Sequence, residues 1–464
     1  MDLKFTSVAE QAALVREGTV SARALTEFVL GEIERLNPVL NAFNLVLRAD
    51  ALAEADRRDA ALAAGEVTGP LHGVPIAIKD EYDVAGTRTT FGTGAVTRSR
   101  ATDSEIVRRL RAAGAVIVGK TLMPEFGIWP FTESTTYGVT RNPWHLDRST
   151  SGSSGGTAAA VASGMVAAGI GGDGGGSIRL PASWCGLFGL KPQRGRVSMG
   201  PHARLWRSLG TAGPLTRTVV DSALIYDVIS GSLPTDAYAA EPWSTSLTEA
   251  LTRDPGSLRI RVVTDNPGGG PAPDAATLAA VRASAEALAS HGHRVEEGPL
   301  PGYRPGLSFL AQVAAGVAEE VGHVDDPRRL EMRTRAAVRI TRPLVGRADA
   351  AERAAERLAA RVNRVFEEVD LILMATTPTA AVRIGQLDTP LPLLALKATR
   401  TASLTSPWNL LGNPAAAVPA GLTDDGLPLS VQLAGRPSSE PLLMQVAAQL
   451  ETIRPWRDRR PPVS

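Results

Sequence analysis

Residues 152–191 read GSSGGTAAAVASGMVAAGIGGDGGGSIRLPASWCGLFGLK, and this stretch carries more structural information than any other part of the chain. Two serine–glycine clusters, at 152–156 and 174–177, flank small apolar residues that predict a helix over about 157–168. Because glycine tolerates positive φ, successive backbone N–H groups in such a cluster can converge. Converging N–H groups can hold an oxyanion, and Ser177 would stand beside the anion that it helps to create.

A serine hydroxyl is a poor nucleophile at neutral pH and needs a base. Lys79 ends an apolar run, residues 74–78, that predicts a buried strand within the segment GVPIAIKD (73–80). A lysine held in an apolar pocket has a lowered pKa and can accept a proton. Lys79 is therefore the candidate base for Ser177.

Three segments resemble the amidase signature family: GVPIAIKD (73–80), GSSGGTAAAVASG (152–164) and GGDGGGSIRLPASWCGLFGLKP (171–192). The resemblance covers roughly residues 6–453 and implies a Ser-cisSer-Lys triad. In that triad Ser177 is the nucleophile, Ser153 is a bridging serine held by a cis peptide, and Lys79 is the base. The resemblance also implies an oxyanion hole formed by the backbone of Gly174, Gly175, Gly176 and Ser177.

Other residues near the clusters receive supporting roles. Asp173 and Arg179 are expected to shape the loop by hydrogen bonding and charge pairing. We expect an acyl pocket built from residues 126–137, 198–210 and 380–408, with Phe126, Trp129 and Tyr137 as walls. The predicted substrate-binding residues are Ser151, Gly152, Ser154 and Trp129. Ser151 stands where the family commonly has glycine, and Gly174 where it commonly has isoleucine. The backbone at both positions tolerates these residues, so the two departures are not expected to abolish activity.

The resemblance implies hydrolysis of a carboxamide to a carboxylic acid and ammonia or an amine, through an acyl-enzyme on Ser177. The expected partner is a small-molecule amide, with no metal or cofactor and no nucleic acid; a homodimer is a further expectation. Two alternatives stay open. One is the glutaminase A subunit of a glutamyl-tRNA amidotransferase, which shares the triad, and the other is a catalytically silent relative that acts by binding.

Two short patterns suggest other chemistry. Residues 114–121 match the phosphate-loop pattern G-x-x-x-x-G-K-T, but the residues between the glycines, Ala-Val-Ile-Val, predict a strand, so nucleotide binding is not expected. Residues 152–156 fit the G-x-S-x-G elbow of α/β-hydrolases, with Ser154 as nucleophile. That elbow needs a strand immediately before it, whereas residues 142–149 read as a loop. The histidines formally available to such an elbow are His202, His291, His293 and His323.

Composition limits the class of protein. Of 464 residues, 44% are hydrophobic and 21% are charged, which is typical of a globular chain. The formal net charge of +1 gives no electrostatic case for nucleic acid or an anionic membrane. The single cysteine, Cys185, excludes an internal disulfide framework and predicts a small buried side chain. The absence of a signal-peptide pattern and of a long apolar run predicts a cytoplasmic protein.

The resemblance implies one α/β/α domain over residues 1–464, with a mixed twisted sheet covered by helices on both faces. Its parts are an N-terminal helical layer (about 6–65), a catalytic core (about 66–230), a variable substrate-facing part (about 230–400) and a C-terminal sheet and helix segment (about 401–455). The alternation of strand and helix patterns independently favours an α/β fold.

Caps and apolar spacing predict the individual elements. Helices are predicted over about 8–17 (capped by Ser7), 22–37 (capped by Ser21 and ended by Asn37-Pro38), 49–64, 103–113 (capped by Thr102), 219–229, 275–290 (capped by Asp274) and 442–453. Strands are predicted over 74–78, 115–118, 258–264, 293–296 and 370–374. The arginine-rich residues 328–364 indicate a solvated helix face, with an anionic partner such as tRNA as the alternative. The residues from Trp456 onward predict a poorly ordered tail.

Overall fold

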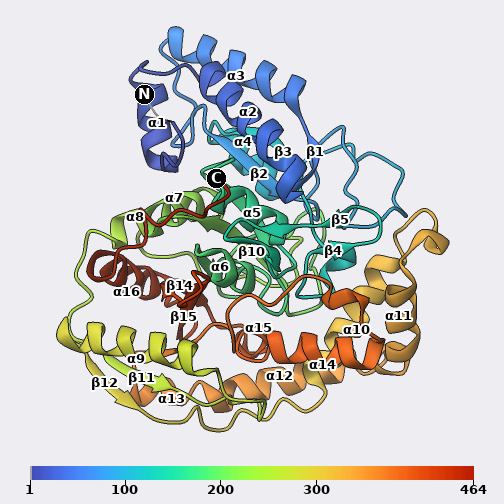
Figure 1. The fold of residues 1–464 in the computed structure, drawn as a ribbon, viewed down its shortest axis with the longest axis vertical. Helices are drawn as coiled ribbons and strands as arrows, with labels where there is room; N and C mark the ends of the chain where they lie inside the picture. The colour runs from blue at the N-terminus through green and yellow to red at the C-terminus, as the bar shows by residue number, and fades with distance from the viewer. Residues whose placement is uncertain (1–2) are drawn as a thin grey trace.

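The computed structural model describes residues 3–464. Within them, eleven strands form one mixed sheet, and Figure 1 shows it running from the N-terminal helices at one end to β11 and β12 at the other. In sheet order the strands are β1 (Phe43–Val46), β3 (Val116–Thr121), β2 (Pro75–Lys79), β8 (Ala168–Asp173), β10 (Thr211–Thr216), β9 (Phe188–Lys191), β14 (Ala415–Leu422), β15 (Pro428–Gly435), β13 (Leu371–Ala375), β11 (Arg259–Val263) and β12 (Arg294–Glu297).

Sixteen α-helices surround the sheet in the described part of the chain. They are α1 (Val8–Arg16), α2 (Ala22–Leu40), α3 (Arg48–Ala63), α4 (Glu105–Ala112), α5 (Gly155–Ala162), α6 (Arg179–Cys185), α7 (Val219–Ile229), α8 (Leu247–Ala250), α9 (Ala275–Ser290), α10 (Ser308–Val321), α11 (Met332–Val345), α12 (Ala348–Val362), α13 (Val365–Glu368), α14 (Leu391–Thr401), α15 (Ser406–Leu411) and α16 (Glu440–Ile453). The shorter elements are η1 (Glu125–Gly127), η2 (Pro327–Arg329), η3 (Gln386–Asp388), and two hairpins, β4 (Glu133–Ser134) with β5 (Gly138–Val139) and β6 (Arg141–Asn142) with β7 (His145–Ser149).

Side chains alternate between the two faces of the sheet, as the pleat of a strand requires. In β2, Ile76 and Ile78 join the apolar cluster that contains residues of α4, α7 and α16, whereas Ala77 joins the cluster that contains residues of α2 and α5. Helices therefore cover both faces, and the predicted α/β fold with a mixed sheet is confirmed. By the same alternation Lys79 projects on the Ala77 side, toward α5.

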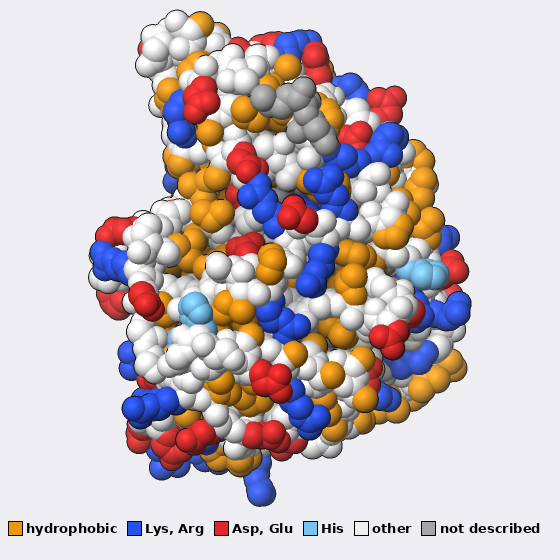
Figure 2. Space-filling model, turned by 60° about the vertical axis from the view of Figure 1, so that its left-hand side comes forward, with side chains coloured by type: hydrophobic (Ala, Val, Ile, Leu, Met, Phe, Trp, Pro, Cys, Tyr) orange, Lys and Arg blue, Asp and Glu red, His pale blue; other side chains and the backbone are white. Residues whose placement is uncertain are grey.

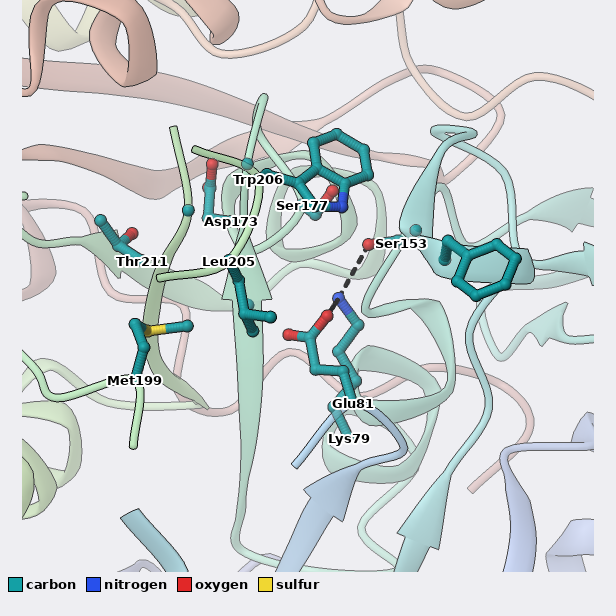
Figure 3. A pocket seen from close by; sticks show the side chains of 14 residues that line it. Lys79, Glu81, Ser153, Asp173, Ser177, Met199, Leu205, Trp206 and Thr211 are labelled. Carbon is teal, nitrogen blue, oxygen red and sulfur yellow. Dashed lines mark hydrogen bonds and ion pairs between the residues drawn. The ribbon is translucent and has the colours of Figure 1, made fainter. Parts of the chain in front are cut away.

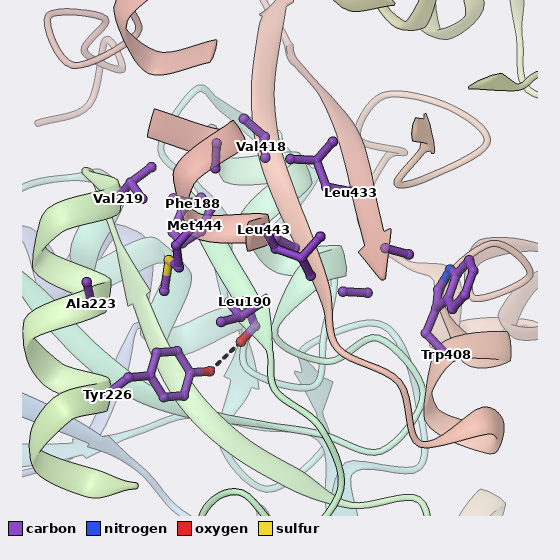
Figure 4. Close-up of a cluster of buried hydrophobic side chains, with 14 of the residues drawn as sticks. Phe188, Leu190, Val219, Ala223, Tyr226, Trp408, Val418, Leu433, Leu443 and Met444 are labelled. Atoms are coloured by element: carbon purple, nitrogen blue, oxygen red, sulfur yellow. Dashed lines mark hydrogen bonds between the residues drawn. The ribbon is translucent and has the colours of Figure 1, made fainter. Parts of the chain in front are cut away.

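The core behind the site packs α7 and α16 against the centre of the sheet (Figure 4). Tyr226 of α7 is fully buried, and its hydroxyl donates a hydrogen bond to the Leu190 carbonyl at 2.5 Å. The same apolar cluster includes Phe188, Val219, Ala223, Val418, Leu433, Leu443 and Met444. This packing fixes β9 and its partner β10, and β10 pairs in turn with β8, the strand that leads to Ser177.

Parallel pairing brings two functional segments to one edge of the sheet. β2 pairs in parallel with β8, with Ile78 opposite Ile170. Lys79 at the end of β2 and Asp173 at the end of β8 therefore lie at the same carboxyl edge, where open α/β sheets commonly hold their ligands.

Several helix caps agree with the sequence predictions. Ser7 and Glu10 form the capping box of α1, and Ser21 and Asp274 cap α2 and α9 through their side chains. The prediction for α4 was wrong in its cap, because the helix starts at Glu105 with Ser104 as its cap and not with Thr102. Glu105 instead pairs with arginines in the next turn of α4.

Two predicted helix ends were wrong. α2 continues through Pro38 and ends at Leu40, because the proline falls in the last turn and Asn41 then takes a left-handed conformation. The side chain of Asn37 accepts hydrogen bonds from the N–H groups that follow this end. The helix predicted over 157–168 ends at Ala162, since Gly164 (φ 78°) turns the chain into β8.

Two segments predicted without regular structure are ordered by the fold. Residues 142–149 contain strand β7, which pairs with β6 outside the main sheet, so the loop prediction was wrong. The tail is also packed. Trp456 is buried and its Nε1 donates to the Arg217 carbonyl at 2.9 Å, and the Val463 N–H donates to the Pro143 carbonyl at 3.2 Å. An apolar indole thus anchors a segment whose composition reads as polar.

Basic and acidic side chains are interspersed over the face shown in Figure 2, without a large area of one sign. In α12, which lies in the arginine-rich stretch, the buried residues recur at helical spacing on one side. No helix within residues 3–464 is long and apolar enough to cross a membrane.

Two helical glycines offer a matched test of packing beside the site. A Cβ on Gly156 in α5 would lie 2.5 Å from both the Ala42 carbonyl oxygen and the Leu122 nitrogen, whereas a Cβ on Gly31 in α2 would contact nothing within 4 Å. We expect Gly156→Ala to lower the free energy of unfolding by about 1–3 kcal/mol. Gly31→Ala should raise it by up to about 1 kcal/mol. Urea unfolding of both variants measures this, and equal midpoints would contradict the packing argument.

Candidate active site

Lys79 is buried at the end of β2, with only 1% of its side chain exposed. Its Nζ donates a hydrogen bond to Ser153 Oγ at 2.8 Å and lies 3.0 Å from Glu81 Oε2 (Figure 3). Burial lowers the pKa of Lys79 below the ordinary lysine value, although the charges of Glu81 and Asp173 oppose that shift. The lysine is therefore closer to a neutral, proton-accepting state than a surface lysine.

Ser153 follows a cis peptide bond after Gly152. A Cβ on Gly152 would lie 2.9 Å from the Phe131 nitrogen, so only glycine fits between Ser153 and that segment. Ser154 closes the cluster from the other side: its N–H donates to the Ser177 carbonyl at 3.3 Å, and its hydroxyl donates to the Gly172 carbonyl at 3.2 Å. The two serine–glycine clusters are thus joined through their backbones.

Ser177 lies between β8 and α6 and is half-buried. It lines the same cavity as Lys79 and Ser153, and the three labelled side chains face this space in Figure 3. Within residues 3–464 its hydroxyl makes no hydrogen bond to another side chain. Of the two serine hydroxyls that line the cavity, the Ser177 Oγ is therefore the one that is free to contact a ligand.

The loop from Asp173 to Ser177 borders the cavity, which Asp173, Gly174 and Ser177 line. Among the described residues, the N–H groups of Gly174, Gly175 and Ser177 have no hydrogen-bond acceptor. Gly176, predicted as a fourth oxyanion donor, instead donates its N–H to Asp173 Oδ1 at 2.7 Å. Gly176 has φ 129°, and a Cβ there would lie 2.2 Å from Thr405 Oγ1, so this position requires glycine.

Asp173 and Arg179 form a buried ion pair beneath this loop, in line with the prediction that they shape it. Arg179 Nη2 lies 2.9 Å from Asp173 Oδ1, and neither side chain is exposed. Burial alone would raise the pKa of Asp173, but the charge and hydrogen bonds of Arg179 outweigh burial and hold it well below the ordinary value. Arg179 also donates to the Thr405 carbonyl and to side chains of Asn409 and Gln432.

Two of the three segments expected to form an acyl pocket supply the apolar side chains of the cavity wall, Phe126 from one and Met199, Leu205 and Trp206 from the other. Residues 380–408 contribute nothing to its lining. The residues that line it are Lys79, Glu81, Phe126, Gly127, Ser153, Gly172, Asp173, Gly174, Ser177, Met199, Leu205, Trp206, Gly210 and Thr211.

Several residues predicted to bind substrate lie elsewhere. Trp129 packs with Phe131 and Trp184 in an apolar cluster outside the lining. Ser151, Gly152 and Ser154 lie behind the lining, where the Ser151 hydroxyl donates to the Pro130 carbonyl at 3.0 Å. Tyr137 is also outside the lining.

Glu81 and Thr211 were not predicted as site residues, whereas Met199 and Trp206 lie within the expected segment 198–210 without having been named singly. Glu81 follows the GVPIAIKD segment directly, so its position beside Lys79 was the available signal.

The competing sequence patterns do not build sites. Residues 116–121 form strand β3, and Lys120 is buried in a 2.7 Å ion pair with Asp80. No histidine lines the cavity, and the Ser154 hydroxyl is occupied by the backbone of Gly172. Among residues 3–464, no three His, Cys, Asp or Glu side chains are grouped as a metal site.

Comparison with known proteins shows which family the chain belongs to. The sequence matches the Amidase family over residues 24–444. It is 44% identical to "Putative amidase AmiB2" of Mycobacterium tuberculosis, over 100% of this chain and 99% of that protein.

Two solved structures share the fold. 6-aminohexanoate cyclic dimer hydrolase complexed with substrate superposes with a TM-score of 0.92 at 34% identity, over 99% of both chains. A bacterial aryl acylamidase of the amidase signature family superposes with a TM-score of 0.88 at 27% identity, over 98% of this chain and 97% of that one. The chain therefore belongs to the amidase signature family, as its motifs indicated, and is an enzyme that hydrolyses amide C–N bonds.

The buried ion pair should govern stability at low pH. Because Arg179 holds the pKa of Asp173 below its unfolded value of about 4, the pair stabilises the fold fully above that pH and loses its effect as the pH falls below it. Asp173→Asn leaves Arg179 buried without a counter-charge and should cost about 3–5 kcal/mol at pH 7. The difference between the unfolding free energies of the two proteins, measured by urea unfolding from about pH 7 to about pH 3, should narrow below about pH 4. A constant difference would contradict this assignment.

Proposed function

We propose that this amidase works through an acyl-enzyme on Ser177, with Ser153 passing protons between Ser177 and Lys79. The observation that carries the proposal is the 2.8 Å contact between buried Lys79 Nζ and Ser153 Oγ, at a cavity that Ser177 also lines. A buried lysine with a lowered pKa supplies a base without histidine. The serine hydroxyl between Lys79 and Ser177 supplies the proton path.

In the first half of the reaction, Lys79 accepts the proton of Ser153, which accepts the proton of Ser177 as Ser177 Oγ attacks the carbonyl carbon. Catalytic hydrogen bonds are often long before substrate binds, and a hydrogen bond from Ser177 to Ser153 would form in the complex. The N–H groups of Gly174, Gly175 and Ser177 would stabilise the oxyanion; loss of one such donor costs about 2.7–4 kcal/mol in another hydrolase.

The proton on the relay then passes to the leaving nitrogen, the C–N bond breaks, and ammonia or an amine departs. Water attacks the acyl ester next, losing its proton to the same relay. The ester bond breaks, Ser177 regains its proton and the carboxylic acid is released. Lys79, Ser153 and Ser177 thus end each cycle in their starting states.

The walls of the cavity favour an uncharged amide with an apolar acyl group. Phe126, Met199, Leu205 and Trp206 supply apolar surface. The charged groups of the lining are already paired, Lys79 with Glu81 and Asp173 with Arg179, so a charged substrate would find no free counter-ion there. One solved relative is a hydrolase of a cyclic dimer, complexed with its substrate, which makes that neutral diamide a sensible first compound to test.

Labelling of the nucleophile tests the relay. A fluorophosphonate should modify Ser177 in the wild-type enzyme, and Lys79→Ala should lose that labelling because the relay has no base. Amide hydrolysis by Ser177→Ala, measured as release of ammonia or of the free amine, should fall by about 10³-fold or more. Peptide mapping by mass spectrometry identifies the labelled serine.

Other outcomes of that experiment favour the alternatives. Label on Ser154 that is indifferent to Lys79 would contradict the relay. A chain without label would support a silent relative, and hydrolysis of glutamine alone in the presence of partner subunits would support an amidotransferase subunit.

Trp206 should set the size of the acyl group. A Cβ on Gly174 would lie 2.8 Å from Trp206 Cε3, so the indole occupies the space beside the proposed oxyanion donors. We expect Trp206→Ala to lower kcat/KM for small amides by about tenfold or more and to raise the relative kcat/KM for bulky aromatic amides. Trp206→Phe is the conservative control and should shift the preference less. An unchanged preference across an amide series would contradict this role.

A further inference from the structure

Glu81 is a second carboxylate at the centre of the cavity, and the relay described above has no role for it. The chain turns directly after β2, where the N–H groups of Glu81 and Tyr82 both donate to the Lys79 carbonyl, at 2.7 and 3.1 Å. This turn brings the Glu81 side chain back beside Lys79, which precedes it by two residues. The Glu81 side chain is 13% exposed and lines the cavity with Ser153 and Ser177 (Figure 3).

The Lys79 ammonium is held between two groups. Ser153 Oγ lies 2.8 Å from Nζ, and Glu81 Oε2 lies 3.0 Å from it. The other carboxylate oxygen rests against Gly172, where a Cβ would lie 1.7 Å from Glu81 Oε1. Glycine at this position therefore makes room for the carboxylate, and the carboxylate in turn fixes where Nζ can lie.

We propose that Glu81 is a positioning residue that directs Lys79 Nζ at Ser153 and stabilises the protonated lysine. Glu81 thereby sets the lowest pH at which the enzyme is active. This inference rests on the proposed relay, because it concerns the charge state of the lysine that the relay uses as its base.

The charges around the pair come from three elements. Asp173 at the end of β8 also favours protonated Lys79, but it is already bound by Arg179. Tyr82 and Glu320 are the titratable groups that face Glu81. Tyr82 is buried beside it, and burial in α10, with the negative charges of Glu319 and Glu81, raises the pKa of Glu320 to about 7. Glu81 is thus the only one of these groups in direct contact with Lys79 Nζ among the described residues.

The sign of the effect follows from the pairing. A negative charge at 3.0 Å favours the protonated lysine, so it raises the pH above which Lys79 becomes a free base. Replacing the carboxylate by the neutral, nearly isosteric amide removes that charge and keeps an oxygen that can accept from Nζ. The acid limb of the pH–rate profile should therefore move to lower pH in Glu81→Gln.

The experiment measures kcat/KM for a neutral amide against pH, together with the rate of fluorophosphonate labelling of Ser177 against pH. Glu81→Gln should move both acid limbs down by about one pH unit or more. Glu81→Asp keeps the charge and withdraws it by one methylene, so its acid limb should stay near that of the wild type while its plateau falls. Glu27→Gln, the same chemical change on the exposed face of α2, should change neither.

The outcomes separate this inference from the proposed function. An acid limb that Glu81→Gln leaves in place, or moves to higher pH, would overturn the role of Glu81 even if Lys79→Ala is inactive. If Glu81→Gln does not fold, Glu81→Asp tests the proposal. A plateau of kcat/KM in Glu81→Asp equal to that of the wild type would overturn the positioning role. Lys79→Ala that still labels Ser177 at the wild-type rate would instead overturn the relay itself.

Discussion

The ion pair between Asp173 and Arg179 is the interaction on which the geometry of the site depends. Both groups are fully buried, so the free-energy cost of their desolvation is offset only if the donors and acceptors around them are satisfied. Asp173 accepts from the N–H groups of Gly176 and Ile178, and Arg179 reaches side chains of α15 and β15. One buried pair therefore fixes the loop that carries Ser177 and ties it to the C-terminal part of the sheet.

A second feature of the site is the contrast between two neighbouring lysines. Lys120 on β3 has three oxygen partners, Asp80 together with the Arg88 carbonyl and the Thr89 hydroxyl, which matches the three donors of an ammonium group. Lys79 on β2 has two, Ser153 and Glu81, in equally dry surroundings. In the described part of the chain Lys120 therefore has a partner for each ammonium hydrogen, whereas Lys79 has one hydrogen without a partner. The lysine with fewer partners is the one that the proposed relay uses as its base.

The sequence predicted the elements with strong periodicity or caps, such as α1, α7, α9 and the strands β2 and β13. It did not predict the strands β8, β9 and β10, because their glycines and small residues give no alternating pattern and their partners are distant in the chain. The short helix α6 was not predicted either. Lys79, Ser153 and Ser177 came from motif resemblance and lie on one cavity. Glu81 directly follows a quoted motif and reaches Lys79 through a local turn. Trp206 lies outside the motifs, and its place depends on tertiary packing that local patterns do not encode.

The packing of Trp206 accounts for a departure that the sequence alone left without a cause. Gly174 stands where the family commonly has isoleucine, and the space that a side chain would take there is filled by the indole. Trp206 and Arg207 both have positive φ, and Arg207 is held by Glu352 of α12 and Glu319 of α10. The absence of a side chain at Gly174 and the indole of Trp206 therefore depend on each other, because both positions share the same space. An isoleucine at position 174 would require a smaller residue at position 206. In this chain the shape of the pocket is set by helices far along the sequence that hold the loop with Trp206 beside Gly174 and Ser177.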